Sequence, residues 1–478
     1  MKTKKLYIQL KSLSVAEMKD LQKAVNSPYF NSNPSVTLLF KKLKRQHPDF
    51  DDSLRGSRVL YKKLFPDEAF NDGKLRRLFT FLSQVVERFI VAESIDRQPA
   101  LRLELLSEEY ERRNLPALFQ RENYRLETAQ NENPIKDADW HLRNYEMLMS
   151  RYSSLSHEKY NPQDDTLQRA GDDLDTYWCL QKIRLEILQK SREQIFNEKK
   201  PAGFLPLPSE ETGWRNALTA LYFQALDITT EQRGTDFGDY EKRFADLEEG
   251  LSEYDRPLFF ITGLNYLIRR GNRGEANLSG SILRWYDKGI KKGYLLINNR
   301  ISAPAFGNYI FHACKQKDFT AAENFIAGYA HLLPAEVRAD EVAYSRSVIL
   351  FTQKKYDAVV LGLSGYEFSL PYILKTRILI LKTYFELFLQ DEDTYTDLVF
   401  SALKSYENYL HRNDTFSPQY VAGHRNFIVV LRRLLHQMRS DTPRKELSHR
   451  LRKELMHLPG MPGGQNWLEE LIRRFERS

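Results

Sequence analysis

The sequence predicts an all-α protein, built from stacked antiparallel helix pairs that form an α-solenoid, with a further helical region at its N-terminal end. Signals for a helix start recur along the 478 residues. Apolar residues recur at steps of three and four, the period of a helix face, and no stretch shows the period of two that marks a half-buried strand. A chain of this length also exceeds the roughly 250–300 residues over which one core keeps growing, so it must form several domains or a linear stack of small units.

The bulk composition is that of a globular protein. Hydrophobic residues make up 42% and charged residues 28%, and the mean hydropathy of -0.55 excludes a membrane-embedded body. The longest charge-free apolar stretch, 257–268, is shorter than the roughly 20 residues of a spanning helix, so we expect a core helix there. Lys11 interrupts the apolar run after the basic start, which argues against export. Two cysteines, Cys179 and Cys314, make no disulfide framework, so we expect buried thiols in a cytoplasmic protein.

Residues 1–95 are predicted to form an N-terminal basic helical module. Ser14 and Glu17 have the spacing of a capping box, and Asn33 before Pro34 marks a helix start. Another helix is expected to begin near Asn71, and its apolar stripe consists of Leu75, Leu78, Phe79, Leu82, Val85, Val86, Phe89 and Ile90.

Four further regions are expected along the chain. A helical region with long helices covers 96–200, with starts at Asn133-Pro134 and Asn161-Pro162, and a Pro/Gly linker follows at 201–213. A helical repeat region covers 214–440. Its segment 373–389 is apolar on several faces, which indicates neighbours on several sides. Basic C-terminal helices cover 441–478, and the last of them is amphipathic through Trp467, Leu468, Leu471, Ile472 and Phe475.

The net charge of +7 is unevenly distributed. Residues 1–95 hold 18 Lys and Arg against 10 Asp and Glu, and residues 425–478 hold 12 against 6, so the middle of the chain is acidic. Basic ends are able to contact nucleic acid or acidic proteins. The alternative is solvated helix faces, because both signs of charge are interspersed along every segment.

A weak internal repeat runs through residues 300–411. The hexapeptide 317–322 is faintly echoed at 354–359 and at 393–398, where aromatic residues stand at Phe319, Tyr356 and Tyr395, 37 and then 39 residues apart. Each aromatic is expected to open the second helix of a pair, with small or apolar residues three and seven places later, such as Ala322. A helix pair cannot bury its own apolar face, so such units stabilise one another by stacking.

At these residues the chain resembles tetratricopeptide-type (TPR) repeat proteins, although the spacing exceeds their usual period of about 34 residues. The layout of the whole chain is similar to that of uncharacterised all-helical bacterial proteins, which implies no activity. The TPR resemblance implies a TPR-like solenoid that binds a protein or peptide along a concave surface of first helices. By alignment with that family, the groove residues are Phe311, Lys315, Tyr344, Val348 and Phe351. The alternative is that the aromatics among them belong to the core.

We assign no catalytic, cofactor-binding or metal-binding residue. The sequence has no glycine-rich phosphate loop, no closely spaced Cys or His pairs for zinc, and no calcium loop. Cys314 follows His312 closely, but neighbouring helical residues point in different directions and do not face each other. An active site assembled from distant positions would leave no such mark.

One helix, expected after Ser417-Pro418, carries a basic ridge. Arg425, Arg432, His436 and Arg439 fall on one side of it, away from the apolar stripe. The ridge could engage phosphates or an acidic partner, and the alternative is a solvated face.

These patterns together predict a non-catalytic helical-repeat scaffold for a protein or peptide partner, without membrane insertion. The alternatives are a nucleic-acid-associated factor that uses the basic terminal regions, and an enzyme on an all-helical frame.

Overall fold

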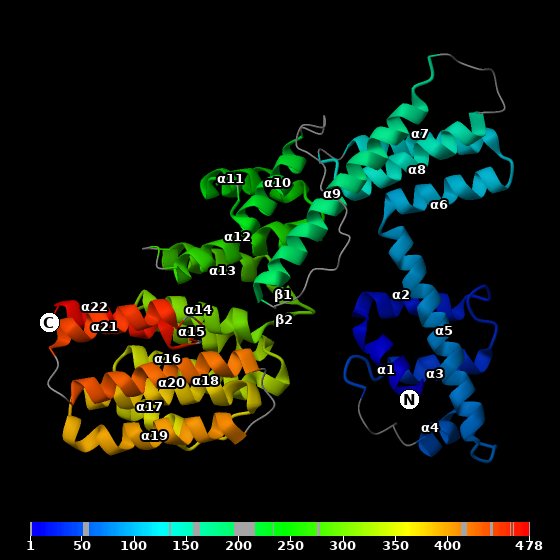
Figure 1. Cartoon of the computed structure of the whole chain (residues 1–478). Coiled ribbons are helices and arrows are strands. Elements are labelled where there is room, and N and C mark those ends of the chain that lie inside the picture. Colours follow the sequence, from blue (N-terminus) through cyan, green and yellow to red (C-terminus); the bar gives the residue numbers. More distant parts are fainter. Residues whose placement is uncertain are drawn as a thin grey trace. The chain divides into compact units, whose positions relative to one another are not determined.

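The computed structural model describes residues 2–50, 57–132, 135–155, 163–195, 216–232, 234–273, 275, 278–412, 418–439, 443–458, 460–461 and 463–477. These residues are almost entirely helical (Figure 1), which confirms the all-α prediction. In the described part of the chain, no helix is long and apolar enough to cross a membrane.

One short hairpin departs from the sequence prediction. Strands β1 (Leu296–Ile297) and β2 (Arg300–Ile301) pair antiparallel, with Leu296 opposite Ile301. Asn298 and Asn299 connect them with φ of 52° and 57°, the left-handed backbone that a tight two-residue hairpin turn requires. Strands of two residues are too short to show any alternation in the sequence.

The chain divides into two compact units. Unit 1 comprises Met1–Pro134 and Leu142–Asp173, and unit 2 comprises Ile135–His141 and Leu174–Ser478. The expected linker at 201–213 and the expected helix starts at 133–134 and 161–162 lie outside the described residues.

Unit 1 is helical throughout its described part. Its helices are α1 (Lys2–Ser12), α2 (Val15–Asn26), α3 (Pro34–Lys44), α4 (Ser57–Leu64), α5 (Asp72–Asp96), α6 (Pro99–Arg112), α7 (Pro116–Asn131), α8 (Ala138–Leu155) and α9 (Thr166–Ile195). Helices α8 and α9 each have residues in both units. The capping box at α2 is confirmed, since Glu17 N donates to Ser14 Oγ at 3.2 Å and Ser14 N donates to Glu17 Oε2 at 2.8 Å. Asn33 and Asn71 cap α3 and α5 as expected. Apolar side chains of α1–α5 form one core.

Unit 2 continues with helices that mostly pack on the helix next to them in the chain. They are α10 (Ala217–Thr230), α11 (Phe237–Leu247), η2 (Glu248–Gly250), α12 (Asp255–Asn272), α13 (Leu278–Lys291), α14 (Ala303–Lys315), α15 (Phe319–Tyr329), η3 (Ala330–Leu332), α16 (Ala335–Thr352), α17 (Tyr356–Ser364), α18 (Leu370–Phe388), α19 (Glu392–Arg412), α20 (Pro418–Met438), α21 (Arg444–His457) and α22 (Gln465–Arg477). The apolar stretch 257–268 lies within α12, where Phe259 and Phe260 are fully buried.

Three helix pairs cover the weak sequence repeat. Helix α14 packs on its partner α15 and on α16, which packs in turn on α17 and α18, and α18 packs on α19. Phe319 and Tyr356 are the first residues of α15 and α17, as predicted. Tyr395 instead lies one turn inside α19, because that helix starts earlier, at Glu392.

Helix α18 has neighbours on several sides, as its all-round apolar sequence indicated. It contacts α16, α17 and α19, and its side chains also reach α22. There the buried Glu386 carboxylate accepts hydrogen bonds from Trp467 Nε1 at 2.8 Å and from Arg474 Nη1 and Nη2 at 2.9 and 2.6 Å. This charged contact ties α22 to α18. The five expected apolar residues of α22 are all buried.

Candidate functional site

A groove crosses the first helices of the three pairs. It has a volume of about 320 Å³ and is lined by residues of α14, α16 and α18, and also by His424 of α20 and Gly463. Its apolar lining comes from Ile310 and Phe311, from Tyr344 and Val348, and from Ile378. We refer to it as the first-helix groove.

The structure brings together three of the five groove residues expected from the sequence. Phe311, Tyr344 and Val348 all line the first-helix groove. Lys315 is exposed in the last turn of α14 and does not line it. Phe351 also lies elsewhere, with its ring 5.6 Å from the ring of Tyr356 and 5.1 Å from Lys382 Nζ.

Two charged groove residues were not anticipated. Glu341 is 1% exposed, and it accepts hydrogen bonds from Tyr372 Oη at 2.7 Å and from Ser345 Oγ at 3.3 Å. Burial raises the pKa of its carboxyl, against the opposing effects of these hydrogen bonds and of Lys375. Lys375 is exposed, and its Nζ lies 5.2 Å from the ring centroid of Tyr372. Gly307 gives Glu341 its space, since a Cβ there would stand 2.9 Å from Glu341 Oε1.

The lining residues recur with a period that the sequence contains. Gly307, Glu341 and Lys375 occupy equivalent positions on successive first helices, and so do Ile310, Tyr344 and Ile378. Within each set, successive residues are 34 positions apart in the sequence. This spacing equals the period of about 34 residues that is typical of TPR repeats. This period was obscured because the second helices carry the more visible aromatic residues, whose spacing is longer and uneven. Aligning the first helices at the constant step would have pointed to Glu341 and Lys375.

His424, which also lines the groove, forms a buried contact with a tyrosine of α19. Its Nδ1 lies 2.7 Å from Tyr406 Oη in a buried contact between α20 and α19. Burial lowers the pKa of His424 to about 4, so the imidazole is neutral near pH 7. We therefore attribute a packing role to it.

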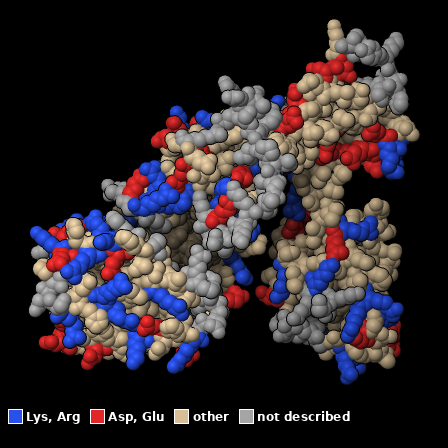
Figure 2. Space-filling view, in the orientation of Figure 1, with Lys and Arg blue, Asp and Glu red and all other residues tan. Residues whose placement is uncertain are grey.

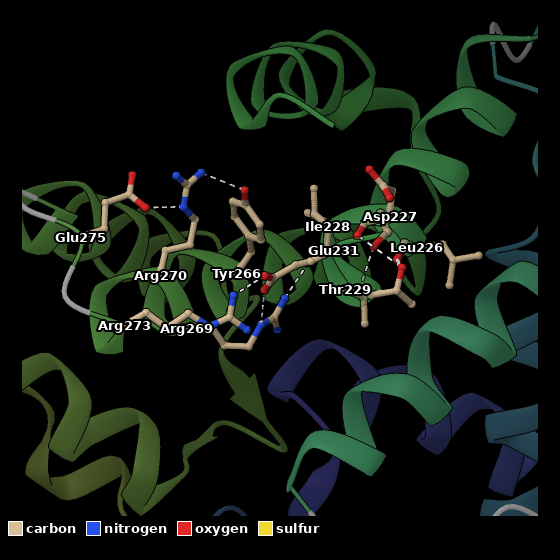
Figure 3. Close-up of polar contacts among 12 residues, drawn as sticks. Leu226, Asp227, Ile228, Thr229, Glu231, Tyr266, Arg269, Arg270, Arg273 and Glu275 are labelled. Atoms are coloured by element: carbon tan, nitrogen blue, oxygen red, sulfur yellow. Dashed lines mark hydrogen bonds and ion pairs between the residues drawn. The ribbon is translucent and has the colours of Figure 1, made fainter. Parts of the chain in front are cut away.

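A second, polar hollow lies near the end of α12 (Figure 3). It has a volume of about 550 Å³ and contains Arg270 and Arg273, beside Arg269. Arg269 donates to Ile228 O at 2.6 Å and pairs with Glu231 at 3.3 Å, and Arg273 pairs with the same carboxylate. Burial raises the pKa of Glu231, but the hydrogen bonds from both arginines outweigh this effect and hold it below its usual range.

The charge of Arg270 in the same hollow is also neutralised by a carboxylate. It donates to Tyr266 Oη at 2.9 Å and pairs with Glu275, as the dashed lines in Figure 3 show. Because each arginine here is ion-paired with a carboxylate, we interpret the cluster as a brace between α10 and α12. No arginine of this cluster is left with an unpaired charge for binding an anion.

The predicted basic ridge on α20 is only partly exposed. Arg425, His436 and Arg439 are exposed. Arg432 differs from the expectation: its side chain is 34% exposed and its Nη2 lies 2.7 Å from Glu407 Oε2 on α19. The ridge is therefore interrupted by an ion pair between two helices.

Burial disfavours the charged form of two thiols and one imidazole outside the groove, those of Cys179, Cys314 and His312. Cys179 and Cys314 are free and buried, and burial raises the pKa of the Cys314 thiol to about 11. Burial lowers the pKa of His312 to about 4, and its Nδ1 lies 3.2 Å from Ser279 Oγ. Among the described residues, no group of three or more His, Cys, Asp or Glu side chains is placed to hold a metal ion.

Comparison of the chain with protein families, with characterised proteins and with solved structures finds no match. The resemblance to TPR proteins therefore stays a prediction.

Proposed function

We propose that this protein is a non-catalytic, TPR-like helical-repeat scaffold that binds a protein or peptide segment in the first-helix groove. The observation that carries the proposal is the regular recurrence of the lining, in which each of α14, α16 and α18 contributes equivalent positions to one groove. Stacked repeats produce such surfaces because each pair adds its first helix to the same face.

The lining fits a peptide with an apolar anchor. Phe311 is 38% exposed, although aromatic side chains of its size usually gain free energy by burial. Tyr344 and Val348 extend this apolar area on the next helix, and the exposed Lys375 adds one positive charge. Apolar area next to a few oriented polar groups is typical of binding sites for peptides and small molecules.

The titratable groups of the groove favour binding over catalysis. Both oxygens of Glu341 are engaged by Tyr372 and Ser345, and His424 is engaged by Tyr406. A general base must come within hydrogen-bond reach of a substrate proton, and Glu341 and His424 are each only 1% exposed, so we assign both to the groove wall.

Site-specific photo-crosslinking tests the proposal. We would replace Phe311 with p-benzoylphenylalanine in the full chain and irradiate native cells. A second chain carrying the same replacement at Leu361, an apolar residue of α17 that is 78% exposed outside the groove, is the matched control.

We expect protein adducts at position 311 that are absent at position 361. Val348→Asp, which places a charge in the groove, should remove these adducts while the melting curve shows that the chain stays folded. Equal adducts at both positions, or adducts that persist in the Val348→Asp chain, would refute the proposal. Adducts to RNA would instead support the nucleic-acid alternative.

A further inference from the structure

A basic groove lies between α18 and α19. It has a volume of about 590 Å³ and is lined by Arg377 of α18 and by Ser401, Lys404, Ser405, Asn408, Tyr409 and Arg412 of α19. Three of these side chains are cations, four carry a hydroxyl or amide group, and none is a carboxylate. Figure 2 shows Lys and Arg side chains, interspersed with Asp and Glu, over the region of unit 2 that includes α19–α22.

The three cations lack the balancing charges found elsewhere in this unit. Arg377, Lys404 and Arg412 form no ion pair with any carboxylate of the described residues. In the brace near α12, by contrast, each arginine is ion-paired with a glutamate. Gathering unpaired like charges in one groove costs repulsion, which a bound anion would relieve.

The sequence of α19 separates its charges onto two sides. Glu407 pairs with Arg432 of α20, away from the basic groove. Ser401, Ser405, Asn408 and Arg412 follow one another at steps of four, three and four, which keeps them on the same helix face. From Ser401 to the end of the helix, that face holds cations and neutral polar groups and no carboxylate.

Arg377 is held in place before any ligand arrives. Its guanidinium carbon lies 4.5 Å from the ring centroid of Tyr409 and 6.0 Å from that of Tyr406, and its Nη1 donates to Ser405 Oγ at 3.4 Å. A guanidinium stacked on an aromatic ring keeps its N–H edge available for a carboxylate or phosphate. Holding it in advance reduces the entropy lost on binding.

We propose that this basic groove binds a short acidic peptide segment in an extended conformation. Lys404 and Arg412 are eight residues apart, which is roughly 12 Å along a helix. An extended peptide advances about 3.3 Å per residue and places alternate side chains on one face, so its acidic residues would stand roughly 6.6 Å apart. Three such residues match the length over which the three cations are spread.

Two observations favour a peptide over a nucleic acid. One face of the Tyr409 ring is already covered by Arg377, so that face is not available for the base stacking that single-stranded nucleic acids use. The positively charged face of α19 is also short, because the negative charge of Asp397 lies one turn before Ser401 on the same helix face.

The inference does not depend on the first-helix groove. Val348 lines that groove and not the basic groove, so Val348→Asp should leave the binding of the acidic peptide unchanged. A failure of one proposal can thus be distinguished from a failure of the other.

Fluorescence anisotropy with the full chain tests the inference. The probe is a labelled nonapeptide of alternating glutamate and serine, and the control peptide has glutamine in place of glutamate. The test variant combines Lys404→Gln with Arg412→Gln. The matched control combines Lys445→Gln with Lys453→Gln, which removes two exposed charges from α21 of the same unit.

We expect the acidic peptide to bind, the neutral one not to bind, and the affinity to fall as salt rises. Since an exposed ion pair contributes a factor of about 1.4 to 5 in affinity, the test variant should bind about twofold to 25-fold more weakly, and the control variant should match the wild type. Equal weakening in both variants would overturn the inference, as would binding of the neutral peptide. Tighter binding of a nine-nucleotide polyuridylate that competes with the peptide would also overturn it and assign the groove to nucleic acid. Far-ultraviolet circular dichroism confirms that each variant is folded.

Discussion

Replacing Gly263 with alanine sets two physical effects against each other. Gly263 lies in the middle of α12, where alanine favours the helix over glycine by up to about 1 kcal/mol. However, a Cβ at this position would stand 2.6 Å from Cη2 and 2.8 Å from Cζ3 of Trp285, whereas carbon atoms pack best at roughly 3.5–4.0 Å. The overlap must be relieved by moving either the ring or the helix.

Neither movement is easy in this core. The Trp285 ring stacks on Phe260 at 4.8 Å, and its Nε1 donates to Glu241 Oε1 at 3.0 Å. Overpacking of a core typically costs about 1–3 kcal/mol, so we expect a net destabilisation of about 1–2 kcal/mol by Gly263→Ala after the gain in helix propensity. Gly362→Ala is the matched control, because Gly362 lies inside α17 and its Cβ would meet nothing closer than Ser347 Oγ at 4.0 Å. That change should stabilise the protein by up to about 1 kcal/mol.

Urea unfolding followed by tryptophan fluorescence measures both changes. All 5 tryptophans fall within the sequence ranges of unit 2, so the signal reports on the unit that contains both glycines. The midpoint should fall for Gly263→Ala and rise for Gly362→Ala, with the slope unchanged. If Gly263→Ala proves as stable as the wild type, the tight contact between α12 and α13 is wrong.

Three further predictions concern packing, charge and pH. Ala322 is fully buried, so Ala322→Phe should cost about 1–3 kcal/mol, and an unchanged melting curve would contradict its packing role. Arg432→Gln should lower the stability by about 0.2–1 kcal/mol in urea unfolding, because it removes the half-exposed pair with Glu407, and a double-mutant cycle with Glu407→Gln should recover this coupling. His312 and His424 have folded-state pKa values lowered from 6.5 to about 4, so the unfolded chain binds protons first as the pH falls. Stability should therefore be highest above about pH 6.5 and decline toward pH 4, and urea midpoints measured for His312→Gln should decline less steeply.

Local signals in the sequence predicted the local structure well. Ser14, Asn33 and Asn71 cap helices as expected, because a cap depends on residues only two or three positions away. The all-round apolar character of α18 also predicted its many neighbours. The hairpin at Leu296–Ile301 left no such signal, since its strands are only two residues long.

Contacts between distant residues were harder to predict. Phe311, Tyr344 and Val348 were predicted by alignment with TPR proteins, and the structure places them along one groove. Glu341 was missed because a buried carboxylate resembles a surface one in sequence. The pairing of Arg432 with Glu407 depends on how α19 and α20 are rotated about their axes, and helix periodicity alone does not fix that rotation.

The contact between Glu386 and Arg474 has a consequence for synthesis of the chain. The two residues are 88 positions apart, so at a translation rate of roughly 5–20 residues per second Glu386 leaves the ribosome about 4–18 s before its partner. During that time the carboxylate lacks the arginine and the tryptophan that accompany its burial, and enclosing an uncompensated charge is unfavourable. Helix α18 is therefore expected to finish docking only after α22 has emerged. In the interval the nascent chain would expose the apolar surface of α18 that α22 covers in the folded unit, including the ring of Phe385, which packs edge-on against Trp467.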